Sequence, residues 1–133
     1  MIDFTPNLVV GVKKIDDQHK ELFTRLNSVI GMGVKSASKE ETQQTINLLS
    51  EYVLKHFSDE EALHRKAKYP KATEHRQLHQ IYLNEIKGLK EEFQKNGPSV
   101  TFTLNLNNSI VKWIVSHIKN ADMEFGKFYN KPV

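Results

Sequence analysis

The stretch that decides the fold is residues 38–66, which reads SKEETQQTINLLSEYVLKHFSDEEALHRK. Apolar residues recur in it every three or four positions, the spacing that lines one face of an α-helix. Ser38, followed three residues later by Glu41, makes a capping box and predicts a helix over about 39–66. Its inward face runs through Ile46, Leu49, Val53, His56, Glu60 and Leu63. Two positions of an otherwise apolar face are therefore polar.

Three other segments have the same periodicity and predict helices over about 16–35, 71–95 and 103–121. Asp16 or Asp17 could cap the first of them. Tyr69-Pro70 separates the second helix from the third, because proline disfavours a helical conformation in the residue before it. Residues 100–104 alternate like a strand but have no partner strand, so we expect an extended lead-in to the last helix.

Short connections make neighbouring helices antiparallel, which predicts an all-α, up-down-up-down four-helix bundle. Residues 1 to about 15 form an N-terminal extended arm that packs across it. The chain of 133 residues suits a single domain spanning 1–133.

Composition excludes several classes of protein. No apolar run is long enough to cross a bilayer and no leader-like segment opens the chain, so we expect a cytoplasmic protein with no membrane insertion. The net charge is only +3, and the basic stretch Arg65, Lys66, Lys68 and Lys71 has no aromatic residues interleaved for stacking. Nucleic acid is therefore not an expected partner. With no cysteine, any metal must be held by imidazole and carboxylate.

Seven polar residues lie on the inward faces of the four predicted helices: His19, His56, Glu60, His75, His79, His117 and Asp122. A single inward histidine is usually a satisfied core residue. Burying seven such groups without a highly charged partner would cost several kcal/mol each. The combination indicates a metal site.

His117 and Asp122 are five residues apart, which places them about 140° apart on an ideal helix. Both reach one site only if the helix unwinds or widens after His117. Asn120, a poor helix former, marks where this is expected.

Seven protein ligands are too many for one ion, and their chemistry suits iron, manganese or zinc. If both carboxylates and an oxo or hydroxo group bridge two ions, the five histidines divide three and two. One ion then keeps an open position for a small molecule such as dioxygen.

At these residues the chain resembles the hemerythrins, specifically their single-domain bacterial form, the bacteriohemerythrins. The resemblance covers nearly the whole length: residues 10–12 and 15–19, His-Phe-Ser-Asp-Glu-Glu at 56–61, Tyr69-Pro70, and Trp-Ile-Val-Ser-His-Ile at 113–118. It implies two iron ions with an oxo or hydroxo bridge and no haem. It assigns His75, His79 and His117 to a saturated iron, His19 and His56 to an open iron, and Glu60 and Asp122 to the bridges.

The resemblance also implies reversible dioxygen binding, for storage or for delivery to an oxygen-consuming enzyme. Such a protein is not an enzyme, and its activity with peroxide would be a weak side reaction at most. We expect a monomer. Two alternatives stay open: a diiron redox enzyme (peroxidase, nitric oxide reductase or ferroxidase), or an oxygen sensor acting through a separate partner.

Apolar side chains should line the oxygen pocket: Leu22, Phe23, Leu63, Trp113 and Ile114. His64 stands where relatives usually have an apolar residue. Either it points to the helix edge and reaches solvent or a nearby acid, or it is a polar group near the oxygen pocket or an extra ligand. Tyr82 is expected to be core.

Overall fold

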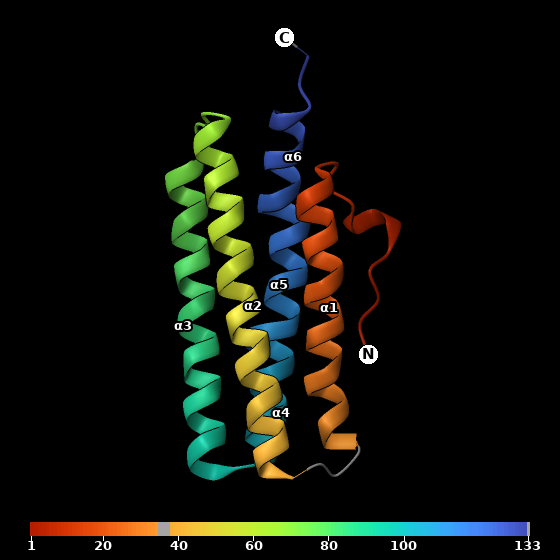
Figure 1. Ribbon diagram of the computed structural model, residues 1–133, viewed down its shortest axis with the longest axis vertical. Coiled ribbons are helices and arrows are strands. Elements are labelled where there is room, and N and C mark those ends of the chain that lie inside the picture. The colour runs from red at the N-terminus through yellow and green to blue at the C-terminus, as the bar shows by residue number, and fades with distance from the viewer. Residues whose placement is uncertain (35–37, 133) are drawn as a thin grey trace.

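The structure is a computed structural model that describes residues 1–34 and 38–132, and in these ranges the chain forms four helical rods packed side by side (Figure 1). The rods are α1 (Lys13–Val34), α2 (Lys39–Lys66), α3 (Ala72–Asn96) and a continuous helical run over 100–129. Short connections reverse the chain direction between consecutive rods. The predicted all-α, up-down-up-down four-helix bundle is confirmed.

The fourth rod consists of α4 (Val100–Asn105), η2 (Leu106–Val111), α5 (Lys112–His117), η3 (Ile118–Asp122) and α6 (Met123–Tyr129). Segments η2 and η3 are π-helical. The extended lead-in expected over 100–104 is wrong. The Ser99 side chain accepts a hydrogen bond of 2.9 Å from the Phe102 N–H and so begins the helix early. The rod also continues to residue 129, well past the expected end near 121.

The helix starts illustrate one correct and one wrong prediction. Ser38 caps α2 as predicted, because its side chain accepts a hydrogen bond of 3.0 Å from the Glu41 N–H. Helix α1 begins at Lys13, so neither Asp16 nor Asp17 is its cap. The Asp16 carboxylate instead accepts hydrogen bonds from the backbone N–H groups of residues 10 and 11, at 2.8 and 3.1 Å. The predicted end of this helix at residue 35 lies outside the described residues.

The N-terminal arm runs alongside α1 and contains one short 3-10 turn, η1 (Pro6–Leu8) (Figure 1). The Asn27 side chain holds it by donating to the Ile2 carbonyl at 2.8 Å and accepting from the Ile2 N–H at 2.9 Å. Farther along, the arm touches α6 at Gly126, where an added Cβ would lie 2.1 Å from the Val10 carbonyl oxygen. The arm therefore contacts the first and the last rods, which agrees with the prediction that it packs across the bundle.

The bundle core has two halves of different chemistry. Near the α3–α4 connection it is apolar and includes Ile46, Leu49, Phe93 and Phe102. At the opposite end, where α2 passes into α3, buried histidines and carboxylates lie among the apolar side chains. In the residues that the structure describes, no helix has the length and apolarity needed to cross a membrane.

Candidate metal centre

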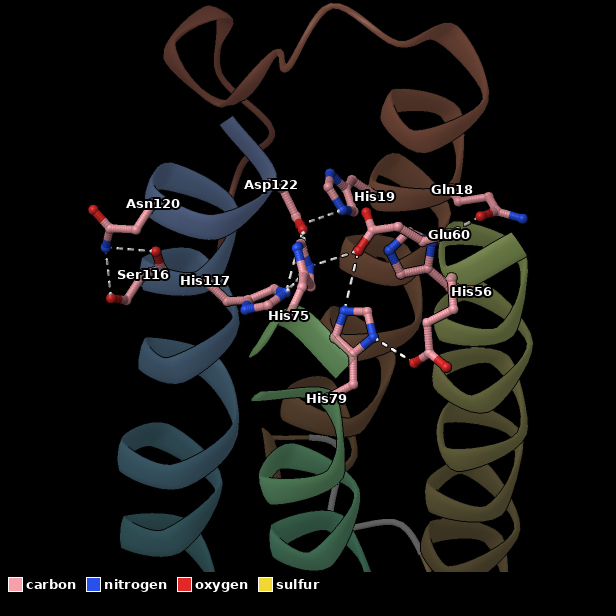
Figure 2. A network of polar contacts seen from close by, with 11 residues as sticks. Gln18, His19, His56, Glu60, His75, His79, Ser116, His117, Asn120 and Asp122 are labelled. Atoms are coloured by element: carbon pink, nitrogen blue, oxygen red, sulfur yellow. Dashed lines mark hydrogen bonds and ion pairs between the residues drawn. The ribbon is translucent and has the colours of Figure 1, made fainter. Parts of the chain in front are cut away.

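All seven residues singled out in the sequence meet in the polar half of the core (Figure 2). Each of the four rods contributes, because the start of α1, the end of α2, the start of α3 and the end of the fourth rod lie at one end of an antiparallel bundle. The residues are His19 on α1, His56 and Glu60 on α2, His75 and His79 on α3, His117 on α5 and Asp122 at the end of η3. Their exposed fractions lie between 0% and 5%.

The ligand atoms form two overlapping sets, and within each set all of them lie within 4.8 Å of one another. One set combines the histidines at 75, 79 and 117 with Glu60 and Asp122. The other combines the histidines at 19 and 56 with the same two acids. The five histidines are thus divided three and two around a shared pair of carboxylates. Such an arrangement suits two adjacent ions bridged by both acids.

The widening expected after His117 is confirmed by the π-helical segment η3. A π-turn bonds each residue to the fifth one along, so residues five apart share a face. This brings the carboxylate of Asp122 to 3.2 Å from Nε2 of His117. Asn120 lies inside the turn, and its side-chain amide donates to the Ser116 carbonyl at 2.9 Å. The π-turn is what allows one helix to supply both ligands.

The contacts within the centre match metal ligands better than hydrogen bonds. Nε2 of His19 lies 3.0 Å from Asp122, and Nε2 of His79 lies 3.0 Å from Glu60. Yet these nitrogens, Nε2 of His56 and all four carboxylate oxygens have no hydrogen-bond partner of acceptable geometry. Buried polar atoms are nearly always satisfied. Among the described residues, one hydrogen bond joins two of these ligands, at 3.1 Å between Nε2 of His75 and Nε2 of His117. The remaining converging lone pairs fit bound cations, and their nitrogen and oxygen chemistry suits iron, manganese or zinc.

Gln18 orients His56 from outside the centre. Nδ1 of His56 donates to the Gln18 amide oxygen at 2.7 Å, and the Gln18 amide nitrogen donates to Asp59 at 2.8 Å. The second bond fixes which way the amide points, and the first leaves Nε2 of His56 as a lone pair facing the centre (Figure 2). Metal-binding histidines typically have such a partner on the other ring nitrogen.

Glu61 has the same role for His79, whose Nδ1 donates to the carboxylate at 2.7 Å. The ring of Phe57 also stacks on that of His79, with centroids 3.8 Å apart and planes 2° from parallel. The sequence pattern predicted no such role for Gln18, Phe57 or Glu61. Each is adjacent in sequence to a ligand, but adjacency alone does not identify which ligand it supports.

The protonation states follow from burial and from neighbouring charges. Burial lowers the pKa of His56 to about 4 and that of His79 to about 3, so both imidazoles are neutral, as metal ligands must be. Burial also acts to lower the pKa of His75, but the carboxylates of Asp122 and Glu60, 3.0 and 2.9 Å from its Nε2, outweigh burial and raise the pKa to about 9. In the metal-free protein a proton on His75 thus offsets part of the carboxylate charge.

The apolar residues expected around the centre are placed as follows. Leu22, Phe23 and Ile114 are fully buried, whereas Leu63 and Trp113 are partly buried against the core. The indole of Trp113 stacks on His117, with centroids 4.6 Å apart, and on Tyr82 behind it, at 4.4 Å. Tyr82 is a core residue, as expected, and its hydroxyl donates to a carbonyl of η2.

His64 does not reach solvent or an acid at the helix edge, so that alternative is wrong. Its exposed fraction is 1%. The rings of Tyr69 and Phe125 cover it, because the chain turns back over the end of α2 and α6 packs against the turn. His64 nevertheless belongs to neither ligand set.

Fold and site together define a class: a four-helix bundle whose core holds a buried histidine and carboxylate site with the chemistry of a metal centre. Comparison with known sequences agrees, because residues 10–129 match the family described as the hemerythrin HHE cation binding domain. The chain belongs to the hemerythrin family.

Individual relatives extend this comparison. A bacteriohemerythrin of Stenotrophomonas maltophilia is 24% identical over 119 residues, covering 90% of this chain and 75% of the relative. A hemerythrin-like protein of Naegleria gruberi is 30% identical over 117 residues, covering 87% and 83%. A myohemerythrin of Sipunculus nudus is 30% identical over 112 residues, covering 84% and 79%.

Proposed function

We propose that this protein binds dioxygen reversibly at a carboxylate-bridged, non-haem diiron centre and serves in oxygen storage or delivery. The observation that carries the proposal is the division of the buried ligands into two sets that share Glu60 and Asp122. The set with three histidines offers five protein ligands, and the set with two histidines offers four. An ion in the smaller set has fewer protein donors, which favours binding of an external ligand on that side.

The chain's own residues would hold the ions as follows. His75, His79 and His117 bind one ion, His19 and His56 bind the other, and Glu60 and Asp122 bridge them. When bound, the two irons supply the electrons and the Lewis acidity for reversible association with dioxygen. Gln18 and Glu61 keep Nε2 of two of these imidazoles turned inward.

The apolar residues expected around the centre are buried, and this favours binding and release over chemistry on oxygen. Leu22 and Ile114 are fully buried, and Phe23 is nearly so. Side chains of this kind keep water and its protons from the centre, which favours return of the gas unchanged.

The ligand set also argues against a diiron enzyme, because such enzymes on helical bundles commonly use a carboxylate-rich set with Glu-x-x-His pairs. The one such stretch near the centre runs from Glu61 to His64. Glu61 is paired with Nδ1 of His79, and His64 lies in neither set. We further propose a monomer that acts in the cytoplasm and supplies an oxygen-requiring enzyme.

Cycling the protein between oxygen and vacuum tests this function. We expect about two irons per purified chain and a colourless reduced form that colours in oxygen and bleaches under vacuum, over repeated cycles. Optical spectra and iron analysis give the readout. A centre that oxidises once and does not recover, or that turns over steadily with peroxide and a reductant, would favour the enzyme and overturn the carrier.

A further inference from the structure

His64 is a buried imidazole that the proposed ligand set leaves without a role. It lies four residues beyond Glu60 on α2, so the two side chains are neighbours on the same helix face. Its ring centroid is 4.4 Å from that of His75, whose Nε2 is 2.9 Å from Glu60. The imidazole therefore lies immediately behind the centre.

No group among the residues that the structure describes forms a hydrogen bond with this imidazole. Within the described ranges, neither of its ring nitrogens has a hydrogen-bond partner. The rings around it, those of Tyr69, Phe125 and His75, make face and edge contacts only. An unsatisfied buried polar group destabilises the folded protein relative to an apolar side chain of similar shape. In the empty centre His64 is thus a destabilising choice for this position.

The Glu60 carboxylate, in turn, lacks a hydrogen-bond donor among the described residues. Neither of its oxygens has a hydrogen bond of acceptable geometry, and the nitrogens that approach it belong to His75 and His79, which are themselves proposed ligands. Carboxylates that bind metal ions are usually hydrogen-bonded by a further residue that is not a ligand. His64 is an N–H donor one helical turn away.

We propose that His64 is a positioning residue of the metal centre, which donates a hydrogen bond to the Glu60 carboxylate when the ions are bound. The inference rests on the diiron function proposed above and assigns His64 a contribution beyond it. Direct ligation is disfavoured, because the His64 nitrogens lie outside both groups of converging ligand atoms. His64 then stabilises the loaded centre relative to the empty one.

Replacing His64 should therefore stabilise the metal-free protein and destabilise the metal-loaded one. His64→Leu removes an unsatisfied imidazole from the metal-free protein and should raise its midpoint of urea unfolding. The same change removes a hydrogen bond from the loaded centre and should weaken metal binding by about 10- to 100-fold, the range for residues that support ligands. The probe is Co²⁺ titrated anaerobically into metal-free protein against a competing chelator.

Two further variants separate hydrogen bonding from packing. His64→Gln keeps an N–H donor of similar reach and should recover a large part of the lost affinity. Phe125→Leu disturbs the ring packed on His64, at a centroid distance of 4.3 Å, without removing a polar group. It should lower the stability of the empty and loaded protein alike and leave the affinity within about threefold of the wild type.

The results have distinct meanings. A His64→Leu protein that binds Co²⁺ as tightly as the wild type overturns this inference, as does an equal loss of affinity in Phe125→Leu or a failure of His64→Gln to recover any. A wild-type protein that binds fewer than two ions, or gains no stability from them, overturns the diiron function instead.

Discussion

At one end of the bundle, around Leu49, Phe93 and Phe102, the core consists of apolar side chains that fill space. At the other end the same rods bury imidazoles and carboxylates, many of whose inward atoms have no hydrogen-bond partner. The apolar half stabilises the fold by removing area from water, and needs nothing outside the chain. Burial in the polar half penalises every charged group, and cations bound there would offset that penalty. The apolar half therefore stabilises the fold by itself, whereas we expect bound ions to stabilise the polar half.

The largest expected effect comes from removing a carboxylate that both ligand sets share. Glu60→Gln should abolish tight binding of both ions, a loss of more than about 100-fold and beyond that of residues that only support ligands. The fold should persist, because the apolar half is untouched. Metal analysis and far-ultraviolet circular dichroism give the two readouts. Retention of one tightly bound ion would show that the sets do not depend on a common bridge.

A truncation in the apolar half should lower the stability of the fold and leave metal binding unchanged. Leu49→Ala removes a fully buried side chain, and we expect it to lower the free energy of unfolding by about 2–5 kcal/mol. Urea unfolding of the metal-free protein measures this. The number of bound ions should stay the same, and a clear loss of metal would mean that the two halves of the core are not independent.

The smallest expected effect is that of a residue that orients a ligand. Glu61→Gln keeps the size of the side chain but removes the charge next to Nδ1 of His79. We expect metal affinity to fall by about tenfold, at the low end of the range for such residues, with little change in metal-free stability. Chelator competition measures the affinity. Glu51→Gln, the same chemical change at an exposed position of α2, is the matched control and should leave the affinity unchanged.

The fold was predictable because its signals are local. The periodicity of residues 39–66 and the capping box at Ser38 were sufficient to place α2. The early start of α4 was missed, because Val100 to Leu104 alternate like a strand and the cap at Ser99 outweighs that pattern. Asp16 was misread for a different reason: a carboxylate before an apolar stripe looks like a cap, whereas here it binds the arm.

The ligands of the centre could be proposed from the sequence because each is a polar residue at an inward position. The spacing of His117 and Asp122 even required the π-turn that the structure contains. The sequence could not identify the hydrogen-bond partners of the histidine nitrogens that face away from the metal centre. Gln18 on α1 bonds to His56 on α2. The burial of His64 depends on Tyr69 and Phe125, which lie outside α2. Contacts of this kind are set by tertiary packing.

The π-turn η3 has a consequence for how the length of this chain can vary. One extra residue in a helix rotates everything after it by about 100°, so the face that α6 presents depends on the turn before it. Phe125 packs against α2 and Gly126 against the arm in that rotated register. Deleting one residue between Ile118 and Ala121 would convert the π-turn into ordinary α-helix, and the resulting rotation of α6 would break both contacts. The number of residues in this turn is constrained by the ligands His117 and Asp122 and also by the contact between α6 and the arm. A deletion at this point in a related sequence would indicate that both the ligand geometry and the arm contact have been lost.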